Sequence, residues 1–311
     1  MKRFRFGVQA SQPTKTGGEW KEIAKRAEGY GYSTLFIPDH LDDAQLSPIV
    51  AMTAAAMATT SLLVGSLVFD NDYRHPVTLA REMATLDLLS EGRLEVGMGA
   101  GWRRSDYDQS GIIFESPGVR VARLSEAIKI MTLMWQSGTA TFSGDYYKVE
   151  GATGLPRPYS GEGPPLIIGG GGRKILDLAS RHAKIVGVNP SLASGVKSSE
   201  VISSVAPERF LERVEWVKES AGSRFADIEL QCLTLVAQVV DNGYSWLSEV
   251  APAFGATVEQ AMETPIVLAG SVEEIVETLE ARRERFGFSY WIIHQHEMEA
   301  FAPVVAALNG K

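Results

Sequence analysis

Residues 62–98 read LLVGSLVFDNDYRHPVTLAREMATLDLLSEGRLEVGM, and this stretch decides the fold class. Its two ends, 62–68 and 93–98, are short runs rich in Leu and Val, and residues 76–90 between them form a helical pattern that begins with proline. Proline suits the first position of a helix, because the N–H of that position has no acceptor within the helix. The run at 62–64 is apolar on both faces, as a parallel strand covered by helices must be. The stretch therefore predicts a strand, a helix and a second, parallel strand.

The same alternation continues along the whole chain. We expect strands at 4–10, 33–37, 62–68, 93–98, 165–168, 185–188, 228–239 and 290–294. We expect the helices that follow them at 19–30, 48–59, 76–90, 119–136, 173–182, 207–221, 271–285 and 298–308. Eight such units without a long linker favour a closed (β/α)8 TIM barrel, an α/β fold. The alternative is an open doubly wound sheet, which usually has a glycine-rich turn after its first strand, and Ala-Ser-Gln-Pro at 10–13 is not such a turn.

The length indicates one barrel with insertions. The chain has 311 residues, and a TIM barrel typically uses about 250. We therefore expect a single domain over 1–311, with the surplus in a hairpin near 139–149 and a helical insertion at 242–264. The second insertion carries Trp246, Phe254 and Met262, which suit either an apolar lid over the barrel mouth or a subunit interface.

Composition excludes several classes of protein. Hydrophobic residues make up 45% and charged residues 22%, which are values of a globular chain rather than a disordered one. The formal net charge of −8 argues against nucleic acid as a partner. The longest apolar stretch, 49–58, is far shorter than the roughly 20 residues of a membrane-spanning helix. The single cysteine, Cys232, allows no intrachain disulfide, and the N-terminus does not resemble a signal peptide, so we expect a cytoplasmic protein that does not bind membranes.

The most specific chemical signal is a glycine run at the end of the fifth expected strand. Gly169, Gly170, Gly171 and Gly172 are followed by Arg173 and Lys174 at the start of a helix. Glycines expose backbone N–H groups, and a helix N-terminus adds unpaired donors and partial positive charge, so the segment predicts a phosphate site. The alternative is a flexible turn into the helix.

Two further strand ends carry candidate residues. Gly97, Gly99 and Gly101 alternate after the fourth strand, where small residues could let a flat ring lie against the backbone or could serve tight strand packing. His40 follows Asp39 after the second strand and could donate a hydrogen bond or move a proton near neutral pH, or could cap the loop.

Metal and hydrolase chemistry find little support in the sequence. His294 and His296 have a spacing that could chelate a metal, but no Asp, Glu or Cys cluster joins them, so we expect no metal site. A Gly-x-Ser-x-Gly elbow and a Walker loop are both lacking. Cys232 lies in an apolar stretch and is expected in the core.

Together these segments resemble the bacterial-luciferase-like flavin and deazaflavin enzymes over nearly the whole chain. The markers are Asp39-His40, segment 65–76, the 93–101 segment RLEVGMGAG, the hairpin sequence GDYY at 144–147, and Pro164-Pro165 before the glycine-rich loop. They are less specific for the branch that resembles enzymes using the deazaflavin coenzyme F420.

The resemblance implies how a cofactor is held. The ring would lie at the barrel mouth near Asp39, Gly99 and Gly101. A non-proline cis peptide would bulge behind the central ring, and by position it would join Ser66 and Leu67. The phosphate would fall on Gly170, Gly171, Gly172 and Arg173.

The resemblance also implies the chemistry. His40 matches the histidine that F420-dependent sugar-phosphate dehydrogenases place beside the cofactor, and would be the catalytic residue. Those enzymes carry a glutamate just after the strand-four glycines, where this sequence has Trp102, so a sugar-phosphate substrate is in doubt and a more apolar pocket is implied.

The sequence is compatible with three functional hypotheses. We favour an F420-dependent oxidoreductase that moves a hydride to or from a small organic substrate. The alternatives are an FMN-dependent monooxygenase fed by a partner flavin reductase, and a non-enzymatic binding protein on the same barrel. The family resemblance suggests a homodimer.

Overall fold

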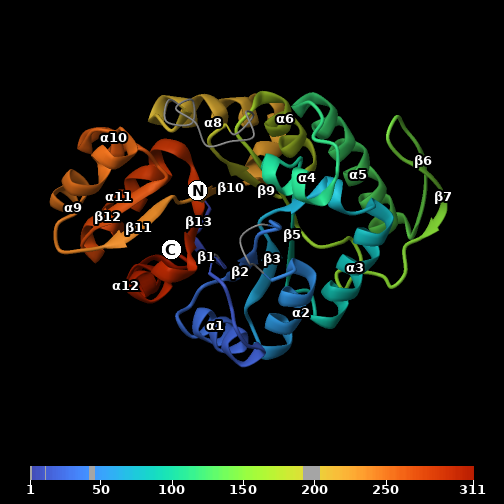
Figure 1. Cartoon of the computed structure of the whole chain (residues 1–311), viewed down its shortest axis with the longest axis horizontal. Helices are drawn as coiled ribbons and strands as arrows, with labels where there is room; N and C mark the ends of the chain where they lie inside the picture. The colour runs from blue at the N-terminus through green and yellow to red at the C-terminus, as the bar shows by residue number, and fades with distance from the viewer. Residues whose placement is uncertain (1, 11, 42–45, 192–203) are drawn as a thin grey trace.

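Eight parallel strands close into a barrel in the computed structural model, which describes residues 2–10, 12–41, 46–191 and 204–311 (Figure 1). In ring order the strands are β1 (Arg5–Gln9), β2 (Thr34–Ile37), β3 (Leu63–Ser66), β5 (Leu94–Gly99), β8 (Leu166–Gly170), β9 (Ile185–Val188), β10 (Glu229–Leu233) and β13 (Phe288–His294). The pairing of β13 with β1 closes the ring. The expected (β/α)8 barrel is therefore confirmed.

Helices surround the barrel, and local sequence explains where they begin. They are α1 (Gly17–Gly29), α2 (Pro48–Ala58), α3 (Pro76–Leu89), α5 (Pro117–Ser137), α6 (Arg173–His182), α8 (Pro207–Ala221), α11 (Val272–Phe286) and α12 (Met298–Leu308). Four of them, α2, α3, α5 and α8, start with proline. Others use side-chain caps, such as Ser271, which accepts the N–H of Glu274 at the start of α11. Among the described residues, none of the helices combines the length and the apolar character needed to cross a bilayer.

The prediction of one long strand over 228–239 is wrong, because the structure has two separate strands there. The chain leaves the barrel after Leu233, where the Thr234 hydroxyl donates to the carbonyl of Ile292 at 3.0 Å. It then forms β11 (Val236–Val239), which pairs with β12 (Val267–Gly270) outside the barrel. A continuous strand of twelve residues would extend about 40 Å, far beyond its barrel neighbours. The sequence also gave no sign of the short β4 (Phe69–Asp70) or of α4 (Arg104–Ser110).

Two insertions interrupt the repeating pattern. The expected hairpin is present as β6 (Thr139–Ser143) and β7 (Lys148–Thr153), and it extends a few residues beyond 149. At the tip of this hairpin, the backbone N–H groups of residues 145–147 donate to the Glu126 carboxylate. The second insertion forms α9 (Gly243–Val250), the 3-10 turn η3 (Ala251–Phe254) and α10 (Val258–Glu263) at one end of the molecule (Figure 1).

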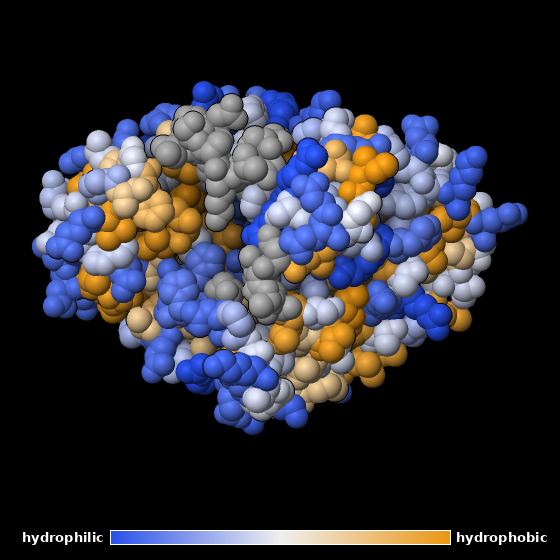
Figure 2. Space-filling view, in the orientation of Figure 1, coloured by the Kyte–Doolittle hydropathy of each residue, from blue (hydrophilic) through white to orange (hydrophobic). Residues whose placement is uncertain are grey.

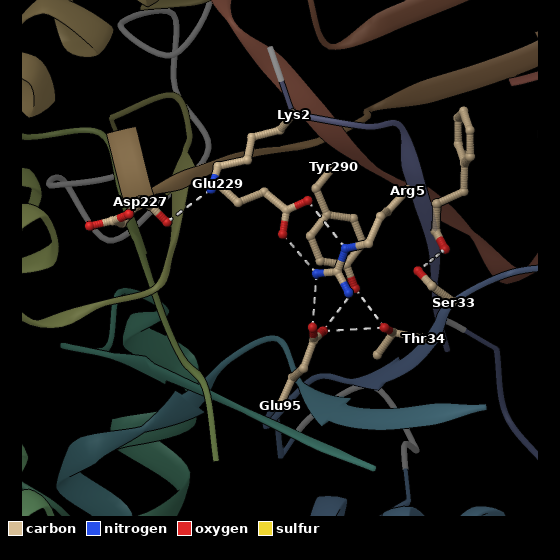
Figure 3. A network of polar contacts seen from close by, with 9 residues as sticks. Lys2, Arg5, Ser33, Thr34, Glu95, Asp227, Glu229 and Tyr290 are labelled. Carbon is tan, nitrogen blue, oxygen red and sulfur yellow. Dashed lines mark hydrogen bonds and ion pairs between the residues drawn. The ribbon is translucent and has the colours of Figure 1, made fainter. Parts of the chain in front are cut away.

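A buried polar network closes the N-terminal end of the barrel (Figure 3). Arg5 Nη2 lies 2.9 Å from both Glu95 and Glu229, and its guanidinium stacks 4.0 Å from the centre of the Tyr290 ring. The Tyr290 hydroxyl lies 2.6 Å from the Thr34 hydroxyl and 2.8 Å from Glu95. Each residue stands at the start of a different strand, so the network ties five strands together at the end opposite the expected active site.

Candidate functional site

A cavity of about 1820 Å³ lies at the C-terminal ends of the barrel strands. Each of the eight barrel strands, or the segment just after it, contributes a residue to the lining: Gln9, His40, Leu67, Gly99, Gly170, Asn189, Gln231 and His294. Active sites of TIM barrels form at this end, because the loops that follow the strands meet there.

His40 is held by a carboxylate that the sequence analysis missed. Its Nδ1 lies 2.7 Å from Asp106 Oδ2, and Asp106 Oδ1 accepts the backbone N–H of Leu41 at 3.1 Å. Asp106 comes from α4 and is almost fully buried. A carboxylate at Nδ1 keeps the proton on that nitrogen, which leaves Nε2 for a ligand. The His40 and Trp102 rings are nearly perpendicular, with centres 5.8 Å apart, and both residues line the cavity.

The Asp39 carboxylate already has protein partners. Both of its oxygens pair with the Arg74 guanidinium, one of them at 3.0 Å, and Oδ2 accepts the backbone N–H of Asp70 at 3.1 Å. Asp39 lines the cavity, but these bonds use its oxygens to join the loop after β2 to the loop after β3. Its expected contact with a cofactor stays a prediction.

The segment after β3 bends into the cavity one residue later than expected. The non-proline cis peptide joins Leu67 and Val68, not Ser66 and Leu67. The reason is that the Leu67 N–H still donates to the carbonyl of Ile37 at 3.0 Å, so the sheet pairing continues through that amide. Leu67 lines the cavity, with its carbonyl accepting Gln9 Nε2 at 3.1 Å.

Ser66 lies behind this bend. It is fully buried, and its hydroxyl accepts the N–H of Gly97 at 3.0 Å and donates to the carbonyl of the same residue at 2.8 Å. The serine therefore fastens β3 to β5, and its side chain is engaged away from the expected cofactor.

The alternating glycines after β5 support close packing of the chain. A Cβ on Gly97 would lie 2.0 Å from the Ser66 carbonyl oxygen, and one on Gly99 would lie 2.6 Å from a methyl group of Val68. Gly101 has a φ of +73°, and its Cβ would lie 1.9 Å from the Tyr107 hydroxyl. Of the two interpretations that the sequence left open, the packing contacts favour tight strand packing. Gly99 and Gly101 still present backbone to the cavity.

The glycine run between β8 and α6 divides into two parts. A Cβ on Gly170 would meet Ile175 at 2.3 Å, and one on Gly171 would meet Pro190 and Ser191 at 2.5 Å, so these glycines serve packing. A Cβ on Gly172 would have no described atom within 4 Å, and no side chain of the described residues caps the N-terminus of α6 there. This open helix end lines the cavity and suits a phosphate.

The side chains beside this helix end differ in their partners. Arg173 pairs with Asp177 at 3.2 Å and with Glu219 at 2.9 Å, so its guanidinium is neutralised by protein carboxylates. Lys174 lines the cavity and makes no ion pair with another described residue. Lys174 is therefore the better candidate to neutralise a bound phosphate.

A third buried carboxylate in the cavity wall is that of Asp70. The Tyr107 hydroxyl lies 3.1 Å from Asp70 Oδ1 and 3.0 Å from Asp72 Oδ2, and Asp72 pairs with Arg123 at 2.9 Å. Burial raises the pKa of the Asp70 carboxyl to about 7. Asp70 lines the cavity, so it can change charge near neutral pH within the site.

The remaining histidines play smaller parts. His75 accepts the N–H of Val77 at the start of α3. The His294 and His296 rings stack with centres 5.9 Å apart, and His294 lines the cavity. Within the described ranges, no group of three or more His, Cys, Asp or Glu residues could hold a metal.

The insertion between β11 and β12 forms part of the cavity wall. Trp246 and Phe254 line the cavity, as an apolar lid would. Tyr244, Phe254 and Met262 are also about half exposed, and apolar surface gathers over this region in Figure 2. Both interpretations of the insertion, as a lid and as an interface, therefore stay open.

Comparison with known proteins identifies relatives of this chain. It is 28% identical over 319 residues to an F420-dependent glucose-6-phosphate dehydrogenase of Kineococcus radiotolerans, covering 99% of this chain and 87% of that protein. A protein of the same name from Nakamurella multipartita is 31% identical over 187 residues, covering 58% of this chain and 54% of that protein.

Solved structures share the fold. An F420-dependent secondary alcohol dehydrogenase, solved with an F420–acetone adduct, superposes with a TM-score of 0.78 and 21% identity over 99% of this chain and 100% of its own. A long-chain alkane monooxygenase superposes with a TM-score of 0.76 and 15% identity, over 99% of this chain and 91% of its own. The family described as luciferase-like monooxygenase matches residues 2–213. The chain, with its eight-stranded barrel and its cavity at the strand ends, therefore belongs to the luciferase-like monooxygenase family.

Proposed function

We propose that this protein is an F420-dependent oxidoreductase that transfers a hydride between F420 and a small organic substrate. The observation that supports it most is the pair of His40 and Asp106, 2.7 Å apart, in the wall of a large cavity that also contains an open helix end. A relative named F420-dependent glucose-6-phosphate dehydrogenase matches 99% of this chain, which supports the same class of reaction.

The residues present suit the cofactor. The open N-terminus of α6 at Gly172 and the amine of Lys174 would hold a phosphate. Backbone at Leu67, Gly99 and Gly101 would lie against the ring system. F420 is a deazaflavin, and when bound it supplies a carbon centre that gives or receives a hydride.

His40 would manage the proton that accompanies the hydride. Oxidation of an alcohol releases one hydride from carbon and one proton from oxygen, and reduction of a carbonyl takes up both. His40 Nε2 would accept the hydroxyl proton in the first direction and return it in the second. Asp106 holds the ring in place and favours the imidazolium that forms.

Trp102 argues for a substrate less polar than a sugar phosphate near His40. Its indole contacts the His40 ring at nearly a right angle and lines the cavity, at the position where the resembling dehydrogenases carry a glutamate. Trp246 and Phe254 add further apolar lining. We therefore propose small alcohols or carbonyl compounds with an apolar body as the substrate class.

Binding of the two candidate cofactors is the first test. The purified apo-protein is titrated with F420 and, separately, with FMN, and tryptophan fluorescence reports binding, since Trp102 and Trp246 line the cavity. We expect F420 to bind at least about tenfold more tightly than FMN. Tighter FMN binding would replace the proposal by an FMN-dependent monooxygenase with a partner flavin reductase, and binding of neither would contradict both.

Turnover tests the role of His40. F420 oxidation and reduction are followed by absorbance with a panel of small alcohols and ketones and with glucose 6-phosphate. We expect His40→Asn to lower kcat by about 100-fold while F420 affinity changes less than about threefold. His296→Asn, a change at an exposed histidine, is the control and should leave kcat unchanged. Equal loss in both variants would contradict a proton-transfer role for His40.

Assembly and location complete the proposal. We propose a homodimer located in the cytoplasm, with no nucleic acid as a partner. The half-exposed apolar side chains of α9 and α10, including Tyr244 and Met262, support a contact between subunits there. The mass in solution, measured by light scattering, tests the dimer, and a monomer at micromolar concentration would refute it.

A further inference from the structure

A buried arginine in the cavity wall lacks a hydrogen-bonding partner. Arg120, in the first turn of α5, is 2% exposed, yet its Nε and Nη1 atoms are buried and unpaired among the described residues. It lines the cavity with Pro117 and Gly118 of the same helix. Burial of an unpaired charge is costly in a folded protein. A guanidinium in this position is therefore expected to meet an anion.

Aromatic rings contact the flat face of this guanidinium, but its N–H edge has no such contact. Its carbon Cζ lies 3.9 Å from the centre of the Phe114 ring and 5.9 Å from that of Tyr107. A cation–π contact uses the flat face, whereas the five N–H bonds point outward in the plane. The rings thus fix the side chain and leave the N–H edge for a carboxylate or phosphate.

Acidic side chains around the same aromatic cluster already have partners. Asp72, which meets the Tyr107 hydroxyl, pairs with Arg123 at 2.9 Å. Asp106, on the same short helix as Tyr107, pairs with His40. Neither carboxylate bonds to Arg120 in the part of the chain that the structure describes, so the anion is left to be supplied by a ligand.

A second cation approaches the same helix end. Lys174 Nζ lies 3.8 Å from the place that a Cβ on Gly118 would take, which puts the amine beside the start of α5. This helix has 21 residues, and its N-cap, Ser116, forms no side-chain cap with the described residues. The unpaired N–H groups and the positive end of the helix dipole add to the attraction for an anion.

We propose that Arg120, Lys174 and the first turn of α5 form an anion-binding site in the cavity wall, which takes a carboxylate or phosphate group of a bound ligand. The group belongs either to the substrate or to the cofactor, and the chemistry of recognition is the same for both. The site does not depend on the F420 assignment, because a free anion can occupy it.

Inorganic phosphate is the probe for this site. It is titrated by calorimetry into the apo-protein and into the protein saturated with F420. The variants are Arg120→Met, which keeps an apolar stem over Phe114, and Lys174→Met at an exposed position. Arg26→Met, at an exposed arginine of α1, is the matched control because it removes the same charge elsewhere.

We expect Arg120→Met and Lys174→Met each to weaken phosphate binding by at least about tenfold, and Arg26→Met by less than about twofold. Phosphate binding that persists in the F420-saturated protein assigns the anion to the substrate. Displacement by F420, with Arg120→Met weakening F420 but not its phosphate-free deazaflavin riboside, assigns it to the cofactor.

Unchanged phosphate affinity in a folded Arg120→Met variant would overturn the proposal. If that variant does not fold, unchanged affinity in Lys174→Met does the same. Arg120-dependent phosphate binding in a protein that fails to bind F420 would overturn the proposed function and leave the anion site standing.

Discussion

At the scale of single residues, the chemistry of the cavity depends on which carboxylate each basic group meets. His40 meets Asp106, Arg74 meets Asp39, and Arg120 meets no carboxylate among the described residues. In the first pair, Nε2 of His40 has no hydrogen-bond partner among the described residues and can take part in proton transfer. In the second pair the two side chains neutralise each other, whereas Arg120 is open to an anion. Residue type alone does not distinguish these three roles.

Asp70 gives a prediction at this scale. Burial raises the pKa of its carboxyl from 3.8 to about 7, so the folded protein binds a proton there that the unfolded chain has lost. Its contribution to stability is therefore present below about pH 4 and decreases as the pH rises to about 7. Asp70→Asn removes this dependence. The unfolding free energy of the variant minus that of the wild type should rise with pH, by up to about 4 kcal/mol between pH 4 and 8.

Urea unfolding at several pH values measures this difference. Asp108→Asn, at an exposed aspartate of the same region, is the control for the removal of one carboxylate. A difference for Asp70→Asn that does not vary with pH, or varies no more than that of the control, would contradict the raised pKa of Asp70.

At the scale of elements, glycines of similar appearance have opposite surroundings. Gly97 on β5 faces the backbone of β3, where a Cβ would lie 2.0 Å from the Ser66 carbonyl oxygen. Gly172 precedes α6, where no described atom lies within 4 Å of that position and φ is −106°. The first glycine is needed so that two strands can approach, whereas the second keeps a helix end open.

Alanine at these two positions should therefore have different effects. Gly97→Ala must displace the backbone of a neighbouring strand and should lower the unfolding free energy by about 3 kcal/mol. Gly172→Ala should change it by less than about 0.5 kcal/mol, because φ is allowed and the space is empty. Chemical denaturation of both variants is the measurement, and similar losses would contradict the packing assigned to β5.

At the scale of the whole molecule, one end of the barrel mainly stabilises the fold and the other end forms the candidate site. The N-terminal end is closed by Arg5, Glu95, Glu229 and Tyr290, and burial raises the pKa of the Tyr290 hydroxyl, which stays protonated as a donor. The C-terminal end is open as a cavity of about 1820 Å³. Changes at the closed end should affect folding without affecting ligands.

Glu95→Ala tests this separation. It leaves Arg5 with one carboxylate and removes one of the two acceptors of the Tyr290 hydroxyl, so the unfolding free energy should fall by about 3 kcal/mol. F420 affinity at low temperature should stay within about twofold of the wild type. Glu22→Ala, which breaks an exposed pair with Lys25, should cost less than about 0.5 kcal/mol. A comparable loss of unfolding free energy in Glu22→Ala would contradict the view that the network at the N-terminal end of the barrel is specially important for stability.

The sequence by itself determined the order of strands and helices. The helices over 173–182, 207–221 and 298–308 and the strand over 185–188 were predicted with the bounds that the structure shows. The helix over 207–221 starts with proline, and the strand over 185–188 is a short buried apolar run. Such features lie within one stretch of chain and can be read without the fold. Position in this order was also enough to place His40 and the glycine run at the cavity.

Only the tertiary structure decided which residues meet there. Asp106 reaches His40 across 66 positions, and Arg74 reaches Asp39 across 35. The end of β10 at Leu233, and the lack of a hydrogen-bond partner for Arg120 among the described residues, likewise follow from neighbours supplied by other strands and helices. Closure of the barrel sets these distances, and no local pattern encodes them, because each contact joins segments whose separation in space depends on all the elements between them.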